Sequence, residues 1–163
     1  MKKILFASIF VVFGFIQSNA QDYYKVAISG AIPTDNASRV ATFSLAADFT
    51  YLFETSRNFS TGITAGYYYS FPEEVNGVEL NDTQFIPIAG AARLDVSNVV
   101  TLSLNAGYGI AIDSADNNGG FYYAPRVLFN LSSVIALKIE YRGLIIPDAR
   151  SFDTIGIGIE FDF

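Results

Sequence analysis

The sequence predicts an all-β protein: an eight-stranded antiparallel up-and-down transmembrane β-barrel, preceded by an N-terminal signal peptide. Three observations predict this fold. Apolar and polar residues alternate with a period of two, the strand-like segments have ten or more residues each, and the connections alternate between short and long. Globular strands average about 5–6 residues, whereas tilted membrane strands need about 9–11. An apolar outer face around a polar interior is expected where lipid is the solvent.

The first 20 residues have the features of a cleaved signal peptide. Two lysines follow Met1, an apolar run extends from Ile4 to Ile16, and small residues lead to Ala20. The run is too short for a membrane-spanning helix, which needs about 20 residues. We therefore expect residues 1–20 to be removed on export and residues 21–163 to form one barrel domain.

Eight strand-like segments follow in order along the remaining chain. They cover residues 23–32, 41–53, 59–71, 83–96, 99–112, 121–131, 135–145 and 154–163. The first, third, fifth and seventh connections are long, and the second, fourth and sixth are tight. Outer-membrane barrels have long outer loops and short periplasmic turns. An even number of strands then places both chain ends at the periplasmic side.

Charged residues fall on only one face of the predicted strands. In the last strand, residues 155, 157, 159, 161 and 163 are Ile or Phe, while the positions between them are polar or Gly. The predicted outward face includes Val26, Ile28, Phe43, Leu45, Phe49, Ile63, Tyr67, Ile86, Ile88, Leu102, Leu104, Val127, Phe129, Leu137, Ile139, Ile157 and Ile159. A Lys or Arg facing lipid at the midplane costs about 2–4 kcal/mol, which explains the segregation.

Four residues disturb this pattern locally. Arg39 and Asp153 would be out of phase if the strands reached them, so we place both in outer loops. Pro87 and Pro125 lie inside the fourth and sixth strands, where each removes a donor from the ladder. Both lie toward the outer ends, and we expect a bulge at each.

The aromatic residues gather at the two ends of the predicted strands. One group lies near the periplasmic rim: Phe49, Tyr51, Phe53, Phe59, Phe129, Phe161 and Phe163. The other lies near the outer rim: Tyr67, Tyr69, Phe71, Phe121, Tyr123 and Tyr141. Two aromatic girdles are typical of membrane barrels. A soluble lipocalin-like barrel, with the apolar face inward, is the alternative; its interior would be too small for these bulky side chains.

The interior charges are the candidate functional residues. We expect a network formed by Lys25, Asp48, Arg93, Arg126, Lys138, Glu140, Arg142 and Glu160. Buried charges must be paired, and eight strands leave room for little more than side chains, so the network is expected to plug the lumen. A gated or narrow ion path is the alternative. A three-residue turn at 132–134 would place Arg126 opposite Glu140, and charge makes Glu160 a candidate partner of Lys138.

Composition excludes most catalytic chemistry. The chain has no Cys and no His, which removes disulfides, thiolate sites and the commonest general base and metal ligand. The net charge is −6 without a basic cluster, which disfavours nucleic-acid binding. Glu73-Glu74 has the character of solvated loop charge, and the segment from Asp113 to Asn118 lacks the spacing of a calcium loop. We therefore expect no enzyme activity, no cofactor and no specific metal site.

The chain resembles the small outer-membrane β-barrel proteins common in Bacteroidetes, which are similar to OmpA/OmpX-type eight-stranded barrels. The resemblance rests on Gln21 after the signal, the strand Phe85-Ile86-Pro87-Ile88-Ala89-Gly90, and the terminal Phe163, and it covers the whole mature chain. It implies residence in the outer membrane of a Gram-negative cell, contact with lipid and lipopolysaccharide, and no defined activity. Ile157, Ile159, Phe161 and Phe163 resemble the signal that the barrel-assembly machinery recognises.

These observations lead to one expected function and one alternative. We expect a monomeric integral outer-membrane protein with a structural or interaction role in the cell envelope. The alternative is a small transporter or narrow channel for ions or hydrophobic molecules. Small barrels that modify lipid A as enzymes rely on a His, which this chain lacks.

Overall fold

A computed structural model describes residues 22–34, 37–39, 41–75, 78–79, 82–112, 119–147 and 151–163. The predicted signal peptide and the segment from Asp113 to Asn118 lie outside the described residues. No helix in the described part of the chain is long and apolar enough to cross a membrane.

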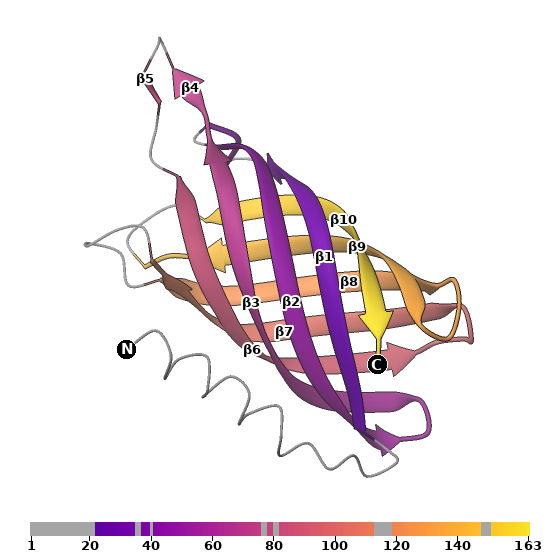
Figure 1. Cartoon of the computed structure of the whole chain (residues 1–163). Coiled ribbons are helices and arrows are strands. Elements are labelled where there is room, and N and C mark those ends of the chain that lie inside the picture. The colour runs from indigo at the N-terminus through magenta and orange to yellow at the C-terminus, as the bar shows by residue number, and fades with distance from the viewer. Residues whose placement is uncertain are drawn as a thin grey trace, which may run out of the picture.

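Eight antiparallel strands close into a barrel, which confirms the predicted fold class (Figure 1). The strands are β1 (Asp22–Thr34), β2 (Ala41–Ser56), β3 (Phe59–Pro72), β6 (Thr83–Asp95), β7 (Val100–Ala111), β8 (Gly120–Asn130), β9 (Ile135–Ile145) and β10 (Phe152–Asp162). Each strand pairs with its neighbours in sequence, and β1 pairs with β10 to close the ring. A 3-10 helix, η1 (Ala37–Arg39), follows β1, and a small hairpin of β4 (Glu74–Val75) and β5 (Val78–Glu79) lies between β3 and β6.

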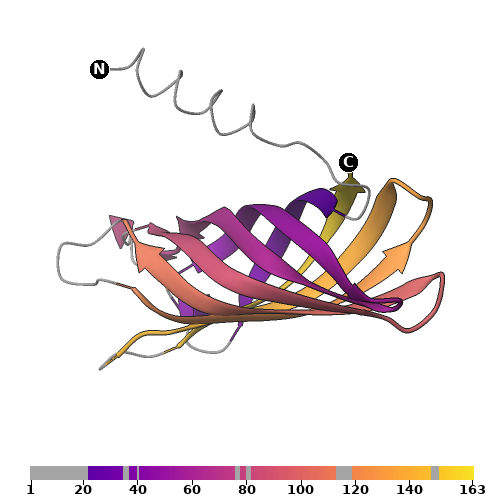
Figure 2. The ribbon, with the colours of Figure 1, turned by 90° about the horizontal axis from the view of Figure 1, so that it is seen from below.

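The strands are staggered as well as paired. Following paired residues from Tyr24 around all eight strands returns to β1 at Thr34, ten residues further along. A stagger of this kind requires the strands to tilt against the barrel axis. Figures 1 and 2 show the result, in which strands of the front wall cross those of the back wall.

The two ends of the barrel differ, as the alternating connections predicted. At one end, here called the hairpin end, three tight turns join β2 to β3, β6 to β7 and β8 to β9, beside the C-terminus (Figure 1). At the other, here called the loop end, lie η1 and the β4–β5 hairpin, which extends beyond β3 and β6.

Two of the tight turns use the same local device. Ser97 Oγ accepts hydrogen bonds from the backbone N–H groups of Val99 and Val100. Ser132 Oγ does the same for Val134 and Ile135. A hydroxyl that caps free donors in this way favours a turn over continued strand. The second turn sets Asn130 opposite Ala136, the register that the sequence predicts.

The barrel has its apolar side chains outside and its polar side chains inside. None of the residues predicted to face outward is buried, and Ile28, Ile63 and Ile157 are among the most exposed. The buried set is instead rich in Ser, Thr and charged residues. Two of the inward positions suit Gly because a Cβ on Gly62 or Gly107 would overlap backbone atoms of the paired strand.

The prediction of bulges at the two prolines is wrong. Pairing between β3 and β6 skips two residue pairs near Pro87, and pairing between β8 and β9 skips two near Pro125, but the register is the same on either side. Each ladder therefore loses local pairing without gaining an extra residue. The register shifts occur instead between β2 and β3, at Ala41/Phe43 and at Glu54/Ser56.

The placement of Asp153 in a loop is also wrong, whereas Arg39 lies in η1 between two strands, as expected. Asp153 is the second residue of β10, opposite Gly143, and it is buried. Ser151 Oγ and Tyr123 Oη donate to its carboxylate, at 2.5 and 3.5 Å. The Tyr123 ring lies over Gly143, where any Cβ would collide with it. An aromatic cover and two hydroxyl donors thus accommodate a carboxylate that the alternation places on the outward side.

Candidate functional site

The centre of the lumen is occupied by a group of five charged side chains, here called the charged layer: Asp48, Arg126, Lys138, Glu140 and Arg142. All five are buried. Asp48, from β2, accepts contacts from three cations on the opposite wall: Arg142 Nη2 at 2.8 Å, Arg126 Nη2 at 2.9 Å and Lys138 Nζ at 3.3 Å. One carboxylate therefore ties β2 to both β8 and β9 through the interior.

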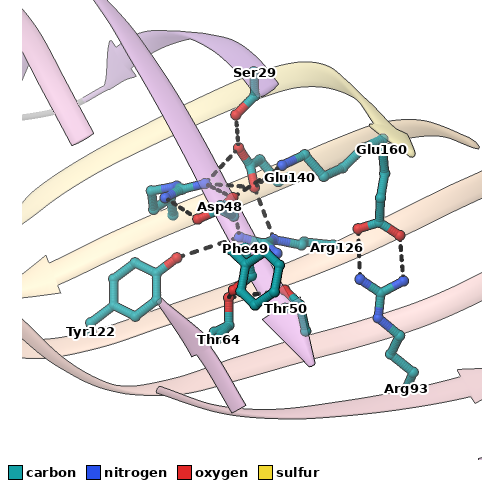
Figure 3. Close-up of polar contacts among 12 residues, drawn as sticks. Ser29, Asp48, Phe49, Thr50, Thr64, Arg93, Tyr122, Arg126, Glu140 and Glu160 are labelled. Carbon is teal, nitrogen blue, oxygen red and sulfur yellow. Dashed lines mark hydrogen bonds and ion pairs between the residues drawn. The ribbon is translucent and has the colours of Figure 1, made fainter. Parts of the chain in front are cut away.

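Glu140 is the second carboxylate of the charged layer, and it contacts the same three cations. Its Oε2 lies 2.9 Å from Arg126 Nε and 3.2 Å from Lys138 Nζ, and its Oε1 lies 3.0 Å from Arg142 Nη2. Ser29 Oγ, on β1, donates to Oε1 at 2.6 Å (Figure 3). The backbone register places Arg126 opposite Glu140, as the length of the preceding turn predicts. Each of the three cations thus lies within ion-pair distance of both carboxylates.

A second ionic group lies nearer the hairpin end. Arg93 donates two parallel hydrogen bonds to Glu160, Nη1 to Oε1 at 2.5 Å and Nη2 to Oε2 at 2.6 Å. Figure 3 shows this pair apart from the residues around Asp48. Lys25 Nζ lies 2.5 Å from Asp162 Oδ2 and 4.0 Å from Glu160 Oε1. Bidentate guanidinium–carboxylate pairs are among the strongest and most directional ionic contacts.

The suggested pairing of Lys138 with Glu160 is wrong. The register between β9 and β10 places Lys138 opposite Gly158, and Glu160 opposite Ala136. Glu160 instead reaches across the lumen to Arg93 on β6, which is four strands away around the barrel. Lys138 joins the charged layer.

Aromatic and aliphatic side chains fill the lumen toward the loop end, a feature that sequence reasoning missed. This aromatic layer consists of Tyr68, Phe85, Tyr122, Leu144 and Phe152, all buried. The rings of Tyr68 and Phe85 stack with centroids 4.4 Å apart. Ala37, from η1, belongs to the same buried cluster. The available signal was large apolar residues at inward positions near the loop ends of their strands.

Arg142 joins the two layers. Its guanidinium carbon lies 5.5 Å from the centre of the Tyr68 ring and 5.7 Å from that of Tyr122. A guanidinium at such a distance is attracted by the electron-rich ring face. The Arg142 guanidinium therefore contacts both the carboxylates of the charged layer and two rings of the aromatic layer.

The hairpin end is open by contrast. A cavity of about 690 Å³ enters the barrel there, and its walls include Lys25, Arg57, Arg93, Asp95 and Thr101. This vestibule reaches Arg93, and its lining includes no residue of the charged layer. Its walls carry both signs of charge, which suits small polar or charged solutes. Among the described residues, no group of three or more His, Cys, Asp or Glu side chains could hold a metal ion.

The four residues of the predicted assembly signal lie on β10 and at its end. Ile157 and Ile159 are exposed on the outward face, and Phe161 is half-buried. Phe163 is the most exposed of the large hydrophobic residues, at 76%. Its backbone exchanges hydrogen bonds with Tyr24, N–H to O at 2.8 Å and O to N–H at 3.4 Å. The last residue therefore takes part in closing the barrel.

Solved structures with the same fold include small outer-membrane proteins. The chain is similar to Ail, the attachment invasion locus protein of Yersinia pestis, in a phospholipid nanodisc, with 13% identity, a TM-score of 0.63, and coverage of 89% of this chain and 100% of that one. It is similar to Neisserial surface protein A, with 12% identity, a TM-score of 0.54, and coverage of 87% and 97%. A de novo designed transmembrane β-barrel matches with 17% identity, a TM-score of 0.56, and coverage of 91% and 100%. No protein-family model and no curated protein matches the sequence.

Proposed function

We propose that this protein is an integral outer-membrane barrel of the OmpA/OmpX-like type, with a closed lumen and a structural or interaction role in the envelope. The observation that carries the proposal is the combination of an apolar outer surface with a lumen filled by the charged and aromatic layers. A barrel with this surface would be insoluble in water, and a barrel with this interior has no obvious path for a solute.

The outer surface supports the membrane location. Large apolar side chains are exposed on every strand of the barrel. Aromatic residues contact one another near both ends, as Tyr24 does with Tyr51 and Phe121 with Tyr123. Closed barrels satisfy their backbone groups internally, which is the condition for crossing lipid. We assign the hairpin end to the periplasm and the loop end, with the β4–β5 hairpin, to the cell exterior. Lipid and lipopolysaccharide would then surround the barrel, and outside partners would meet its loops.

Export and membrane residence can be tested together. Epitope-tagged full-length chain is expressed in a Gram-negative host, and the outer membrane is separated from the soluble periplasm. The proposal expects the mature chain, cut after Ala20, in the outer membrane, with different gel mobility before and after boiling. Recovery of protein from the soluble periplasm with identical mobility in both samples would contradict it.

A narrow channel is the second candidate, because the vestibule opens part of the lumen from the hairpin end. Conductance in planar bilayers separates the two functions. A closed lumen predicts no discrete current steps for the wild type in molar salt. A matched variant, Tyr68→Ala with Phe85→Ala, removes the two stacked rings of the aromatic layer and should raise leakage if it folds. Discrete steps from the wild-type protein would favour the channel.

A further inference from the structure

We propose that the lumen binds a small inorganic anion of the chloride class, between β6, β7 and β8, just beyond the inner end of the vestibule. The residues of the site are Arg93, Ser103, Asn105 and Arg126. Nothing in the proposed structural role requires such a site. The inference depends on the barrel fold and on the contacts inside it.

Unsatisfied donors mark the site. Arg93 Nε, Ser103 Oγ, Asn105 Nδ2 and Arg126 Nη1 are buried and have no hydrogen-bond partner among the described residues. All four residues are at least nine-tenths buried. A buried donor left without an acceptor costs about 1–3 kcal/mol, and more when it is charged. Several such atoms in one region indicate an acceptor that the chain itself does not supply.

The backbone register places these four residues at neighbouring positions on the inner wall. Ser103 on β7 lies directly opposite Arg93 on β6 and directly opposite Arg126 on β8. Asn105 is the next inward-facing residue on β7. Side chains at directly opposite and diagonal positions of one sheet face are within reach of each other. Arg126 Nε also has no hydrogen-bond partner, and the remaining buried polar atoms without partners lie elsewhere, on Tyr68 and Thr154 near the loop end and on Asp162 beside Lys25.

The charges in the lumen indicate an anion as the acceptor. The charged layer has three cations, Arg126, Lys138 and Arg142, against two carboxylates. The group nearer the hairpin end is balanced, with Lys25 and Arg93 against Glu160 and Asp162. The ion-paired residues of the lumen therefore carry one excess positive charge. A buried charge without a counter-charge costs several kcal/mol, which a bound anion would offset.

The carboxylates already present cannot easily serve these donors. Both oxygens of Glu160 are engaged by the two Nη atoms of Arg93, which leaves its Nε free. Arg126 Nε faces Glu140 Oε2 at 2.9 Å as an ion pair, without the alignment of a hydrogen bond. Access is from the hairpin end, because the vestibule is lined by Arg93 and by Thr101, the inward-facing residue before Ser103.

Bromide is the direct probe. Crystals of the full barrel grown in sodium bromide should show an anomalous peak beside Asn105 Nδ2 and Arg126 Nη1. Absence of a peak there, with ordered water in its place, would overturn the proposal. The outcome of the bromide experiment does not depend on the conductance measurement, because a barrel with a closed lumen could either bind an anion at this site or lack such a site.

Solution stability gives a second test, in which chloride replaces gluconate at constant ionic strength. The urea midpoint of the wild type should rise with chloride, because an anion that binds only the folded state stabilises it. In Asn105→Asp the new carboxylate takes the place of the anion. The urea midpoint of this variant in gluconate should therefore be higher than that of the wild type, and it should not change with chloride. Asn105→Leu should retain a reduced response, and Ser56→Asp, exposed at the end of β2 and outside the vestibule lining, should respond like the wild type. Equal responses of the wild type and both Asn105 variants would place any halide effect elsewhere and contradict the site.

Discussion

The charged layer and the aromatic layer lie in the same lumen but are stabilised by different interactions. In the charged layer, long side chains reach across the barrel, and the single carboxylate of Asp48 contacts three cations from the opposite wall. In the aromatic layer, rings stack on their neighbours and gather Ala37 from η1. The first arrangement depends on every partner being present, because a lone buried charge is costly. The stability of the second arrangement depends on how well the side chains fill space, so it should fall in proportion to the buried volume that a substitution removes.

The charged layer should respond most strongly to the loss of one carboxylate. In Glu140→Gln, three cations face Asp48 alone, and the free energy of unfolding should fall by about 3–5 kcal/mol. Urea unfolding from lipid vesicles can be followed by tyrosine fluorescence, since the chain has no Trp. Glu54→Gln, an exposed carboxylate at the hairpin end of β2, is the matched control and should change little.

Adding Arg126→Gln to Glu140→Gln sharpens this test. The double variant removes a cation along with the carboxylate and should recover part of the loss. Losses that simply add would show that the two side chains do not interact, although they lie 2.9 Å apart here.

In the aromatic layer, the loss of stability should depend on the buried volume that a substitution removes. Phe85→Ala removes a fully buried ring stacked on Tyr68, and we expect a loss of about 3 kcal/mol in the free energy of unfolding. Phe121→Ala, on the outward face with half its surface exposed, should lose clearly less. If the two variants lost the same amount, Phe85 would not be packed as described.

Two buried serine hydrogen bonds, one to a charged group and one to a neutral group, allow a comparison of their contributions to stability. Ser29 Oγ donates to the Glu140 carboxylate, whereas Ser44 and Ser70 share a hydrogen bond between neutral hydroxyls near the loop end, each at 2.6 Å. Hydrogen bonds to charged groups contribute about 1.5–3 kcal/mol, and neutral ones about 0.5–1.5. Ser29→Ala should therefore cost more than Ser44→Ala in urea unfolding. The reverse order would mean that Glu140 is satisfied without Ser29.

Phe163 belongs to neither layer, and its loss should leave both intact. Because Phe163 is exposed at the end of β10, its deletion should lower the free energy of unfolding of the refolded barrel by much less than Glu140→Gln or Phe85→Ala does. If the C-terminal residues are read by the assembly machinery, the deletion should still reduce the amount of folded protein in the outer membrane. Normal amounts in cells would contradict that role.

The sequence predicted the face that most strand side chains take, because alternation in a strand is local information. It also predicted the register of β8 against β9, since a three-residue turn at 132–134 leaves one choice. Contacts across the lumen were beyond it. Arg93 meets Glu160 from four strands away, and that meeting depends on the stagger of the whole barrel, which no local pattern contains.

Local exceptions to the alternation were harder to predict. Asp153 is tolerated on the outward side because Tyr123, from a different strand, covers it and Gly143 leaves room for the ring. The aromatic layer was missed for a related reason. Tyr68, Phe85 and Tyr122 alternate correctly as inward residues, but alternation does not show which depth of the lumen they share.

The central claim is that the apolar face meets lipid and the polar face fills the interior, and adjacent residues of β6 test it most directly. Ile88 is 53% exposed on the outward face, and Ala89 is 5% exposed inside. The chain has no Cys, so Ile88→Cys and Ala89→Cys each place a spin label at one site. In vesicles, the label at position 88 should collide readily with lipid-soluble oxygen and rarely with a water-soluble nickel chelate. The cysteine at position 89 should react poorly with the spin label, and any label attached there should collide rarely with either oxygen or the nickel chelate. High nickel accessibility at 88, or oxygen accessibility at 89 as high as at 88, would contradict the account.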